Sequence, residues 1–374
     1  MIEKEFQLNP QGISHIILIA ESIRATFRLE KDKSLYDLNF VLALFYFNVG
    51  DCEKAKNIYI KLLDEYEVNN MNLTSIYNNL GLIYEKQAQF QDAYEYFIKS
   101  LNLHKVFFGV PHEEVSTAYN SLGNFFSGQN ELGQAMSCLQ EAHKILLNIY
   151  GDLHPKLSGV YNSIGEVFRK MGDVNSINKA KFYYLKSLSI LEKGEIGLEA
   201  ANVYNNLGII SEGELKKDYH QKALNIRRRI YGEVNLDVAK SWGNLGMYYL
   251  SQKDFLEAIK HCEKSLSILL EIHREKHPDI AESYLQLGCI YDEMEQFDKA
   301  LQNYFNASTI IPHFFSPNHP LYMEFAIKVK GIHLNPKAIT FFEEKIKDEN
   351  LDEDEKNWCI FILEIMYKEQ KRTK

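Results

Sequence analysis

The sequence predicts an all-α solenoid, in which antiparallel helix pairs stack side by side. Three observations predict it: proline is scarce, bulky apolar residues recur at helical spacing, and one short motif recurs about every 42 residues. Only 8 of the 374 residues are proline, and none lies between Pro10 and Pro111 or between Pro155 and Pro278. Because proline lacks an N–H and clashes with the preceding helical turn, such long proline-free stretches favour helices throughout.

Composition and charge exclude several classes of protein. Hydrophobic residues make up 45% of the chain and charged residues 25%, values that exclude a disordered or collagen-like chain. The net charge is −9, so we expect no nucleic-acid partner, which would need a basic surface. The five cysteines form no Cys-x-x-Cys pair, as expected in a reducing cytosol without disulfides or zinc sites. The apolar run at residues 16–20 is too short to span a bilayer, and we expect a cytoplasmic location.

The repeated motif has an aromatic residue four positions before a glycine and an aliphatic residue directly before it. Successive motif glycines are 42, 42, 43, 38 and 42 residues apart. An aromatic residue usually follows each glycine at +3 and an alanine at +12, so each unit is expected to form two amphipathic helices. One pair cannot bury its apolar face alone, and the units must therefore stack. The six motifs end at Gly81, Gly123, Gly165, Gly208, Gly246 and Gly288.

Seven helix pairs are predicted from this pattern, and further helices are expected at both ends. Residues 320–347 look like a degenerate eighth unit, and helices over 13–30 and 352–369 are expected to cap the stack. We therefore predict an N-terminal capping helix within 1–34, a repeat region over 35–319, and a degenerate repeat with capping helices over 320–374. The seven pairs cover residues 35–66, 73–106, 115–149, 157–193, 199–231, 237–274 and 280–310.

The series of glycine, aromatic residue and alanine at fixed offsets resembles the tetratricopeptide repeat. The usual repeat has about 34 residues. A spacing near 42 is similar to the kinesin light chain and nephrocystin-3-like type, as are the His-Pro pairs at 154–155, 277–278 and 319–320. The resemblance covers about residues 35–320. It implies a right-handed α-solenoid whose first helices line a concave groove, and a protein or peptide partner in that groove.

Polar residues next to the motif glycine are the candidate binding residues. Asparagine stands at −3 in four consecutive units and at −2 in three units. An amide donates and accepts hydrogen bonds at once, so a ladder of amides suits an extended peptide. The resemblance implies that the −2 position holds ligands in several relatives. The alternative is that these amides bond neighbouring helices. The set comprises Asn78, Asn120, Asn162 and Asn205 at −3, and Asn79, Asn206 and Asn244 at −2.

Two basic residues complete the candidate set. Arg169 and Lys170 stand four and five positions after Gly165 and form a small basic spot. Such a spot could hold an acidic peptide or a carboxylate, or it could be an ordinary solvated face.

Units four and five depart from the regular pattern. Unit four carries three inserted residues, expected in its turn near residues 175–177, and unit five is four residues short between Gly208 and Ala223. Because the loss of about one helical turn misaligns stacked helices, we predict a local change of superhelical pitch over 171–220. The alternative is that the insertion and the deletion lie in surface loops and leave the stacking unchanged.

Catalytic and cofactor motifs are missing from the sequence. It contains no glycine-rich phosphate loop, no HExxH and no GxSxG. His273 and His277 have the spacing of a metal-binding pair, but His277 belongs to a His-Pro joint with no third ligand recognised nearby, so we expect no metal. We predict a scaffold or adaptor that is not an enzyme and needs no cofactor. The alternative is a peptide-responsive bacterial regulator similar to the Rap-type quorum-sensing receptors, although residues 1–34 leave room for about one further helix.

Overall fold

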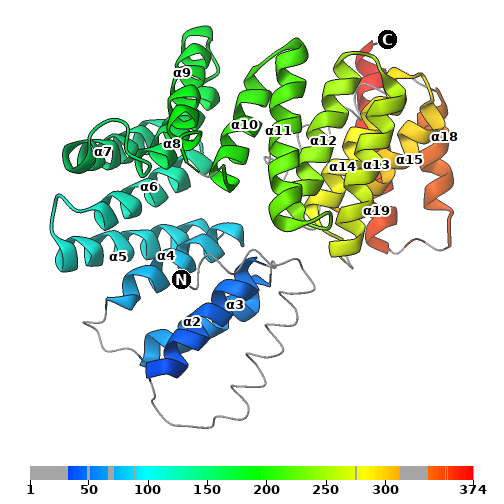
Figure 1. The fold of residues 1–374 in the computed structure, drawn as a ribbon. Coiled ribbons are helices and arrows are strands. Elements are labelled where there is room, and N and C mark those ends of the chain that lie inside the picture. The colour runs from blue at the N-terminus through cyan, green and yellow to red at the C-terminus, as the bar shows by residue number, and fades with distance from the viewer. Residues whose placement is uncertain are drawn as a thin grey trace. The chain divides into compact units, whose positions relative to one another are not determined.

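The computed structural model describes residues 33–48, 51–65, 71–87, 89–194, 196–273, 276–311, 336–349, 351 and 353–373. These residues form sixteen helices and no β-strand (Figure 1). Among them, no helix combines the length and apolar character needed to cross a bilayer. Internal contacts divide the chain into two compact units, residues 1–230 and 231–374. The predicted all-α solenoid is confirmed, and each unit is described by itself.

Unit 1 contains five helix pairs among the described residues. The helices of each pair follow one another through a short turn, and the first helices of successive pairs, α4, α6, α8 and α10, also contact one another. Helices α4, α6, α8 and α10 therefore form a row in which each contacts the next. The pairs are α2 (Lys33–Asn48) with α3 (Cys52–Glu65), α4 (Asn72–Lys86) with α5 (Phe90–Phe108), α6 (Glu113–Gly128) with α7 (Leu132–Tyr150), α8 (Leu157–Met171) with α9 (Val174–Leu191), and α10 (Leu198–Ile210) with α11 (Gly213–Tyr231).

Unit 2 contains three further pairs among the described residues. Helix α13 contacts α14, and α15 contacts α18, so these pairs also stack on one another. The pairs are α12 (Leu236–Ser251) with α13 (Phe255–Ile272), α14 (Pro278–Glu293) with α15 (Phe297–Ser308), and α18 (Pro336–Ile346) with α19 (Glu353–Thr373).

The seven predicted helix pairs coincide with observed pairs to within two residues at each outer boundary. Helix α19 lies where a helix over 352–369 is expected, and α18 covers the end of the predicted degenerate unit. The capping helix expected over 13–30 and the residues 320–335 of that degenerate unit lie outside the described residues. The proposed domain boundaries at 34/35 and 319/320 remain predictions.

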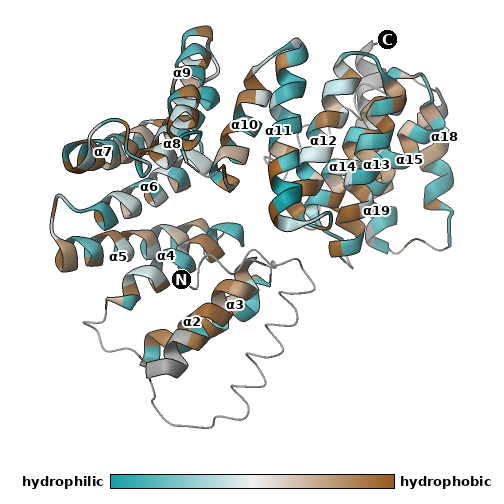
Figure 2. Cartoon of the chain, viewed as in Figure 1, coloured by the Kyte–Doolittle hydropathy of each residue, from teal (hydrophilic) through white to brown (hydrophobic). Residues whose placement is uncertain are grey.

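The motif glycines mark the closest approach between the two helices of a pair. A Cβ on Gly165 would lie 2.6 Å from the Tyr184 ring, and one on Gly246 would lie 2.3 Å from Cys262 Sγ. Equivalent large side chains face the other glycines, so glycine is required because no other residue leaves room. The buried residues of the described helices are mostly apolar, and α11 presents a largely hydrophilic side to the viewer in Figure 2.

The three residues inserted in unit four lie within a helix and not in the expected turn. The turn between α8 and α9 is only Gly172 and Asp173, and the inserted stretch forms the first turn of α9. Asp173 caps this turn, because its carboxylate accepts a 3.0 Å hydrogen bond from the Ser176 backbone N–H. The insertion therefore adds about one turn to α9 before Tyr184, which still faces Gly165, although α9 as a whole has 18 residues against 19 in α5 and in α7.

The deletion in unit five removes the last turn of α10. This helix ends two residues after Gly208, whereas α8 continues six residues beyond Gly165. The shorter connection places His220 opposite Gly208, at the position that Phe97 or Tyr184 occupies in other pairs. His220 is only 2% exposed, and its Nδ1 has no hydrogen-bond partner among the described residues. The predicted change of superhelical pitch remains a prediction.

His220 is expected to make unit 1 sensitive to acid. Burial, with nearby Lys216 and Arg227, lowers the pKa of His220 from 6.5 to about 4. The unfolded chain therefore binds the proton more tightly, and stability is lost as pH falls from about 6.5 towards 4. We expect the free energy of unfolding, measured with urea, to fall between pH 7 and pH 5 by about 2 kcal/mol less in His220→Leu than in the wild type. Equal losses in the two proteins would contradict this.

Candidate functional site

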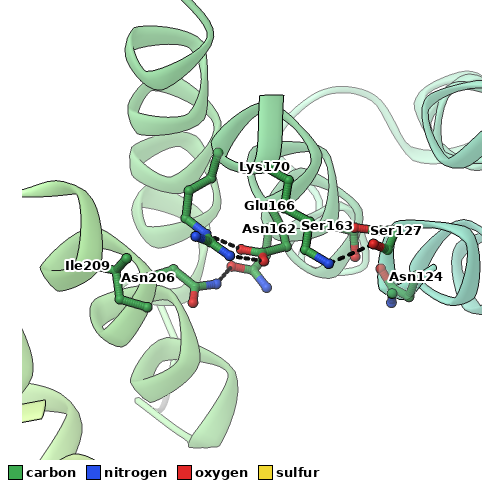
Figure 3. Close-up of a pocket in the computed structure, with 10 residues that line it drawn as sticks. Asn124, Ser127, Asn162, Ser163, Glu166, Lys170, Asn206 and Ile209 are labelled. Atoms are coloured by element: carbon green, nitrogen blue, oxygen red, sulfur yellow. Dashed lines mark hydrogen bonds and ion pairs between the residues drawn. The ribbon is translucent and has the colours of Figure 1, made fainter. Parts of the chain in front are cut away.

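Unit 1 contains a pocket of about 350 Å³ between the first helices of its third, fourth and fifth pairs. Every lining residue comes from a first helix, and residues of three successive repeats therefore meet in one hollow (Figure 3). The lining residues are Asn124, Ser127 and Gly128 from α6, Asn162, Ser163, Glu166, Arg169 and Lys170 from α8, and Asn206 and Ile209 from α10.

Helix α8 supplies half of the lining because its polar residues fall on one stripe. Asn162, Glu166, Arg169 and Lys170 are spaced i, i+4, i+7 and i+8, which places them on a single helical face. The opposite face of α8 is apolar and buries Val160, among others, in the core. The hydrophobic pattern that packs the helix therefore also turns the polar stripe towards the pocket.

Two asparagines of neighbouring repeats contact each other in the pocket. Asn206 Nδ2 donates a 3.0 Å hydrogen bond to Asn162 Oδ1, which joins α10 to α8 (Figure 3). Both side chains are half-buried. The bond uses one polar group of each amide, and an amide has a donor group and an acceptor group. Each asparagine therefore retains hydrogen-bonding capacity for a ligand.

Arg169 is paired within its own helix. Its Nε and one terminal nitrogen donate to the two carboxylate oxygens of Glu166 at 2.8 and 2.6 Å. Tyr184 from α9 donates a further hydrogen bond of 3.0 Å to Glu166. Burial works to raise the pKa of Glu166, but the hydrogen bond and charge of Arg169, with Tyr184, hold this pKa below its ordinary value. The fork geometry of this pair fixes both side chains at the pocket wall.

Lys170 spans two repeats. Its ammonium donates a 2.6 Å hydrogen bond to the Ser127 carbonyl oxygen, in the last turn of α6, where the helix dipole favours a positive charge. Burial lowers the pKa of Lys170, and the charges of Glu166 and Glu85 partly offset this. Burial likewise raises the pKa of Glu85, against the opposing effect of Lys170. The two cations of the expected basic spot are thus balanced by two carboxylates.

The pocket brings together four of the nine predicted binding residues: Asn162, Arg169, Lys170 and Asn206. Asn79 instead donates a 2.9 Å hydrogen bond to the Tyr59 hydroxyl, so it bonds neighbouring helices, which is the alternative role. Asn244 lies on α12 of unit 2, away from these residues in the chain. The remaining three are half-buried on first helices of unit 1 but outside the pocket lining: Asn78 on α4, Asn120 on α6 and Asn205 on α10.

Six pocket residues are missing from the predicted set: Asn124, Ser127, Gly128, Ser163, Glu166 and Ile209. Three of them, Asn124, Glu166 and Ile209, stand directly after the motif glycine. This +1 position lies one helical turn from both the −3 and the +4 positions, and therefore on the same face. Helical spacing alone could have identified it.

Comparisons with known proteins identify the repeat. The family described as Tetratricopeptide repeat matches residues 72–148 and 237–305. These two stretches are similar to tetratricopeptide repeats and together make up less than half of the chain. The first ends within α7, and the second runs from α12 into α15. No curated protein sequence matches the chain significantly.

Two solved structures support the same fold. A chain of the APC/C hetero-tetramer Cut9–Hcn1 superimposes with a TM-score of 0.54 and 17% identity, covering 84% of this chain and 52% of that one. The present chain thus spans about half the length of that neighbour. A Rap protein complexed with competence and sporulation factor gives a TM-score of 0.50 and 14% identity, covering 91% of this chain and 99% of that one. Identities this low establish a common fold alone.

Proposed function

We propose that the protein is a non-enzymatic scaffold or adaptor that holds an extended segment of a protein partner across the first helices α6, α8 and α10. One observation carries the proposal: the amides of Asn124, Asn162 and Asn206 come from three successive repeats and line one pocket. Peptide backbones present donors and acceptors in alternation, which amide side chains can match.

The spacing of the repeats suits an extended chain. Packed helices lie about 8–10 Å apart, and an extended backbone rises about 3.3 Å per residue. A segment that crosses the first helices therefore meets a new amide about every three residues. A pocket of about 350 Å³ holds part of such a segment, and the rest would lie along the neighbouring first helices.

The charge balance of the pocket points to a segment without a strong acidic character. Arg169 is already held by Glu166, and Lys170 by the Ser127 carbonyl near Glu85. An acidic ligand would have to compete with these contacts and approach two carboxylates. We therefore favour recognition of uncharged backbone and side chains over the acidic peptide that the basic spot alone suggests.

The 42-residue spacing supports a finer assignment within the family. We propose that the repeats belong to the kinesin light chain and nephrocystin-3-like type, on the motif spacing and the His-Pro joints. The net charge of −9 supports a partner other than nucleic acid, and scattered, unpaired cysteines support a cytoplasmic location.

A second candidate is a peptide-responsive regulator of the Rap type. It is supported by the Rap neighbour, which this chain covers over 99% of its length. The two candidates differ in what a short peptide does to the protein. Small-angle scattering should show compaction when a peptide drives a regulator between states, and no change of size when a scaffold simply holds a segment.

A photoreactive residue in the pocket tests the scaffold proposal. Asn124 is exposed on α6 and lines the pocket, whereas Asn102 is exposed on the second helix α5. With p-benzoylphenylalanine at position 124 in the full chain, we expect a partner protein to be crosslinked in cell extract and identified by mass spectrometry. The same residue at position 102 is the matched control. Equal crosslinking from both positions would contradict the proposal.

A further inference from the structure

The joint between α13 and α14 in unit 2 combines three metal-ligating side chains. His273 follows the last residue of α13, and His277 is the N-cap of α14. Their rings stack with centroids 3.5 Å apart and planes inclined by 7°. His277 Nδ1 accepts a 3.2 Å hydrogen bond from the Asp279 backbone N–H and lies 3.7 Å from Asp279 Oδ2.

Two other joints in the chain show what is unusual about this one. His112 caps α6 in the same way, with Nδ1 accepting a 3.2 Å hydrogen bond from the Glu114 N–H. It stacks on Phe108, four residues earlier, and His154 stacks on Tyr150 at the same offset. The stacked ring is therefore a regular feature of the joint. Only at His273, among these three joints, does the stacked ring carry nitrogen atoms that can ligate a metal.

His273 carries an unsatisfied ring nitrogen. Its Nε2 is buried and has no hydrogen-bond partner among the described residues. A buried polar atom without a partner costs about 1–3 kcal/mol, whereas the Phe108 and Tyr150 rings at the equivalent positions carry no ring nitrogen. A cation that accepts the nitrogen lone pair would satisfy this atom.

Asp279 offers a third donor, two residues after His277. One ligand atom from each of His273, His277 and Asp279 lies within 4.8 Å of the others. Ligands of one zinc ion lie about 2.0–2.2 Å from the metal and so at most about 4 Å apart. A metal lies in the plane of an imidazole that binds it, so the two rings must turn out of their parallel stack to meet at one ion. The Asp279 Oδ1 contacts the Lys240 ammonium at 3.3 Å, while its Oδ2 faces His277.

A cavity next to the joint leaves room for further ligands. A pocket of about 480 Å³ is lined by His273 together with Lys276, Tyr284 and Asn306, among others. Two imidazoles and one carboxylate with an open position form a donor set used by zinc and other divalent transition metals. We propose that His273, His277 and Asp279 bind one divalent transition-metal ion, with zinc as the reference, and that water from this pocket completes its coordination. The ion would tie the end of α13 to the start of α14.

The regular joints suggest the decisive variant. His273→Phe recreates the Phe108–His112 stack, so it is expected to fold while losing one metal ligand. In calorimetric titration of the chelator-treated full chain with Zn²⁺, we expect one saturable equivalent in the wild type and affinity weakened at least about tenfold in His273→Phe and Asp279→Asn. His112→Asn, at the matched joint of unit 1, should bind Zn²⁺ like the wild type.

Weak zinc sites elsewhere on the chain are common to all these variants and cancel in the comparison. Circular dichroism and thermal unfolding establish that each variant is folded. The proposal is overturned if the wild type binds no Zn²⁺, or if folded His273→Phe binds it with unchanged affinity and stoichiometry.

Discussion

Gly165→Ala is expected to destabilise unit 1 by about 1–2 kcal/mol. The new Cβ would lie 2.6 Å from the Tyr184 ring, which is fully buried and fixed through its hydroxyl to Glu166. Overpacking of this kind costs about 1–3 kcal/mol, occasionally more, and exceeds the gain of about 1 kcal/mol from alanine's helix propensity. Urea unfolding followed by circular dichroism measures the difference.

Gly159 provides the control in the same helix. A Cβ at this position meets nothing within 4 Å, so only the helix propensity changes. Gly159→Ala is expected to leave stability unchanged or to raise it by up to about 1 kcal/mol. If both variants unfold at the same urea concentration, the close approach at Gly165 does not limit the packing of this pair.

Removing the two contacting amides of the pocket is expected to weaken partner binding by about 10- to 100-fold. Asn162→Ala with Asn206→Ala deletes two amides that could bond the bound segment, each worth about 0.5–1.5 kcal/mol, and tenfold corresponds to 1.4 kcal/mol. The variant also loses the 3.0 Å bond between these residues, so its unfolding must be measured in parallel. Calorimetry with the segment identified by crosslinking gives the dissociation constants.

The matched control replaces two exposed asparagines on second helices. Asn102 on α5 and Asn148 on α7 are exposed and lie outside the pocket lining. Asn102→Ala with Asn148→Ala should bind the segment like the wild type. Equal dissociation constants for the pocket variant and this control would show that the two amides do not contribute to binding.

The helix pairs could be predicted from the sequence because the signals that specify them are local. Glycine, aromatic residue and alanine recur within one unit, and each pair buries its face against that repeating pattern. The insertion in unit four was misplaced for a related reason. The distance between motifs gives the number of inserted residues. It does not show whether residues such as 174–177 form part of a helix or of a loop.

The binding pocket was only partly predictable, because its contacts join distant repeats. Lys170 bonds the carbonyl of Ser127, 43 residues earlier, and Asn206 bonds Asn162, 44 residues earlier. A sequence pattern shows that these residues are polar and placed on first helices. It does not show that Glu166 holds Arg169. Because of this pairing, the spot that was expected to be basic is balanced in charge.

The central claim is that a partner segment runs extended across α6, α8 and α10, and crosslink positions on that segment test it most directly. Asn124 on α6 and Ile209 on α10 line the same pocket and lie two repeats apart. With p-benzoylphenylalanine at one or the other position, mass spectrometry should place the crosslinks about five or six residues apart on the segment. Crosslinks to one and the same segment residue from both positions, or equal crosslinking from positions 102 and 148, would contradict the account.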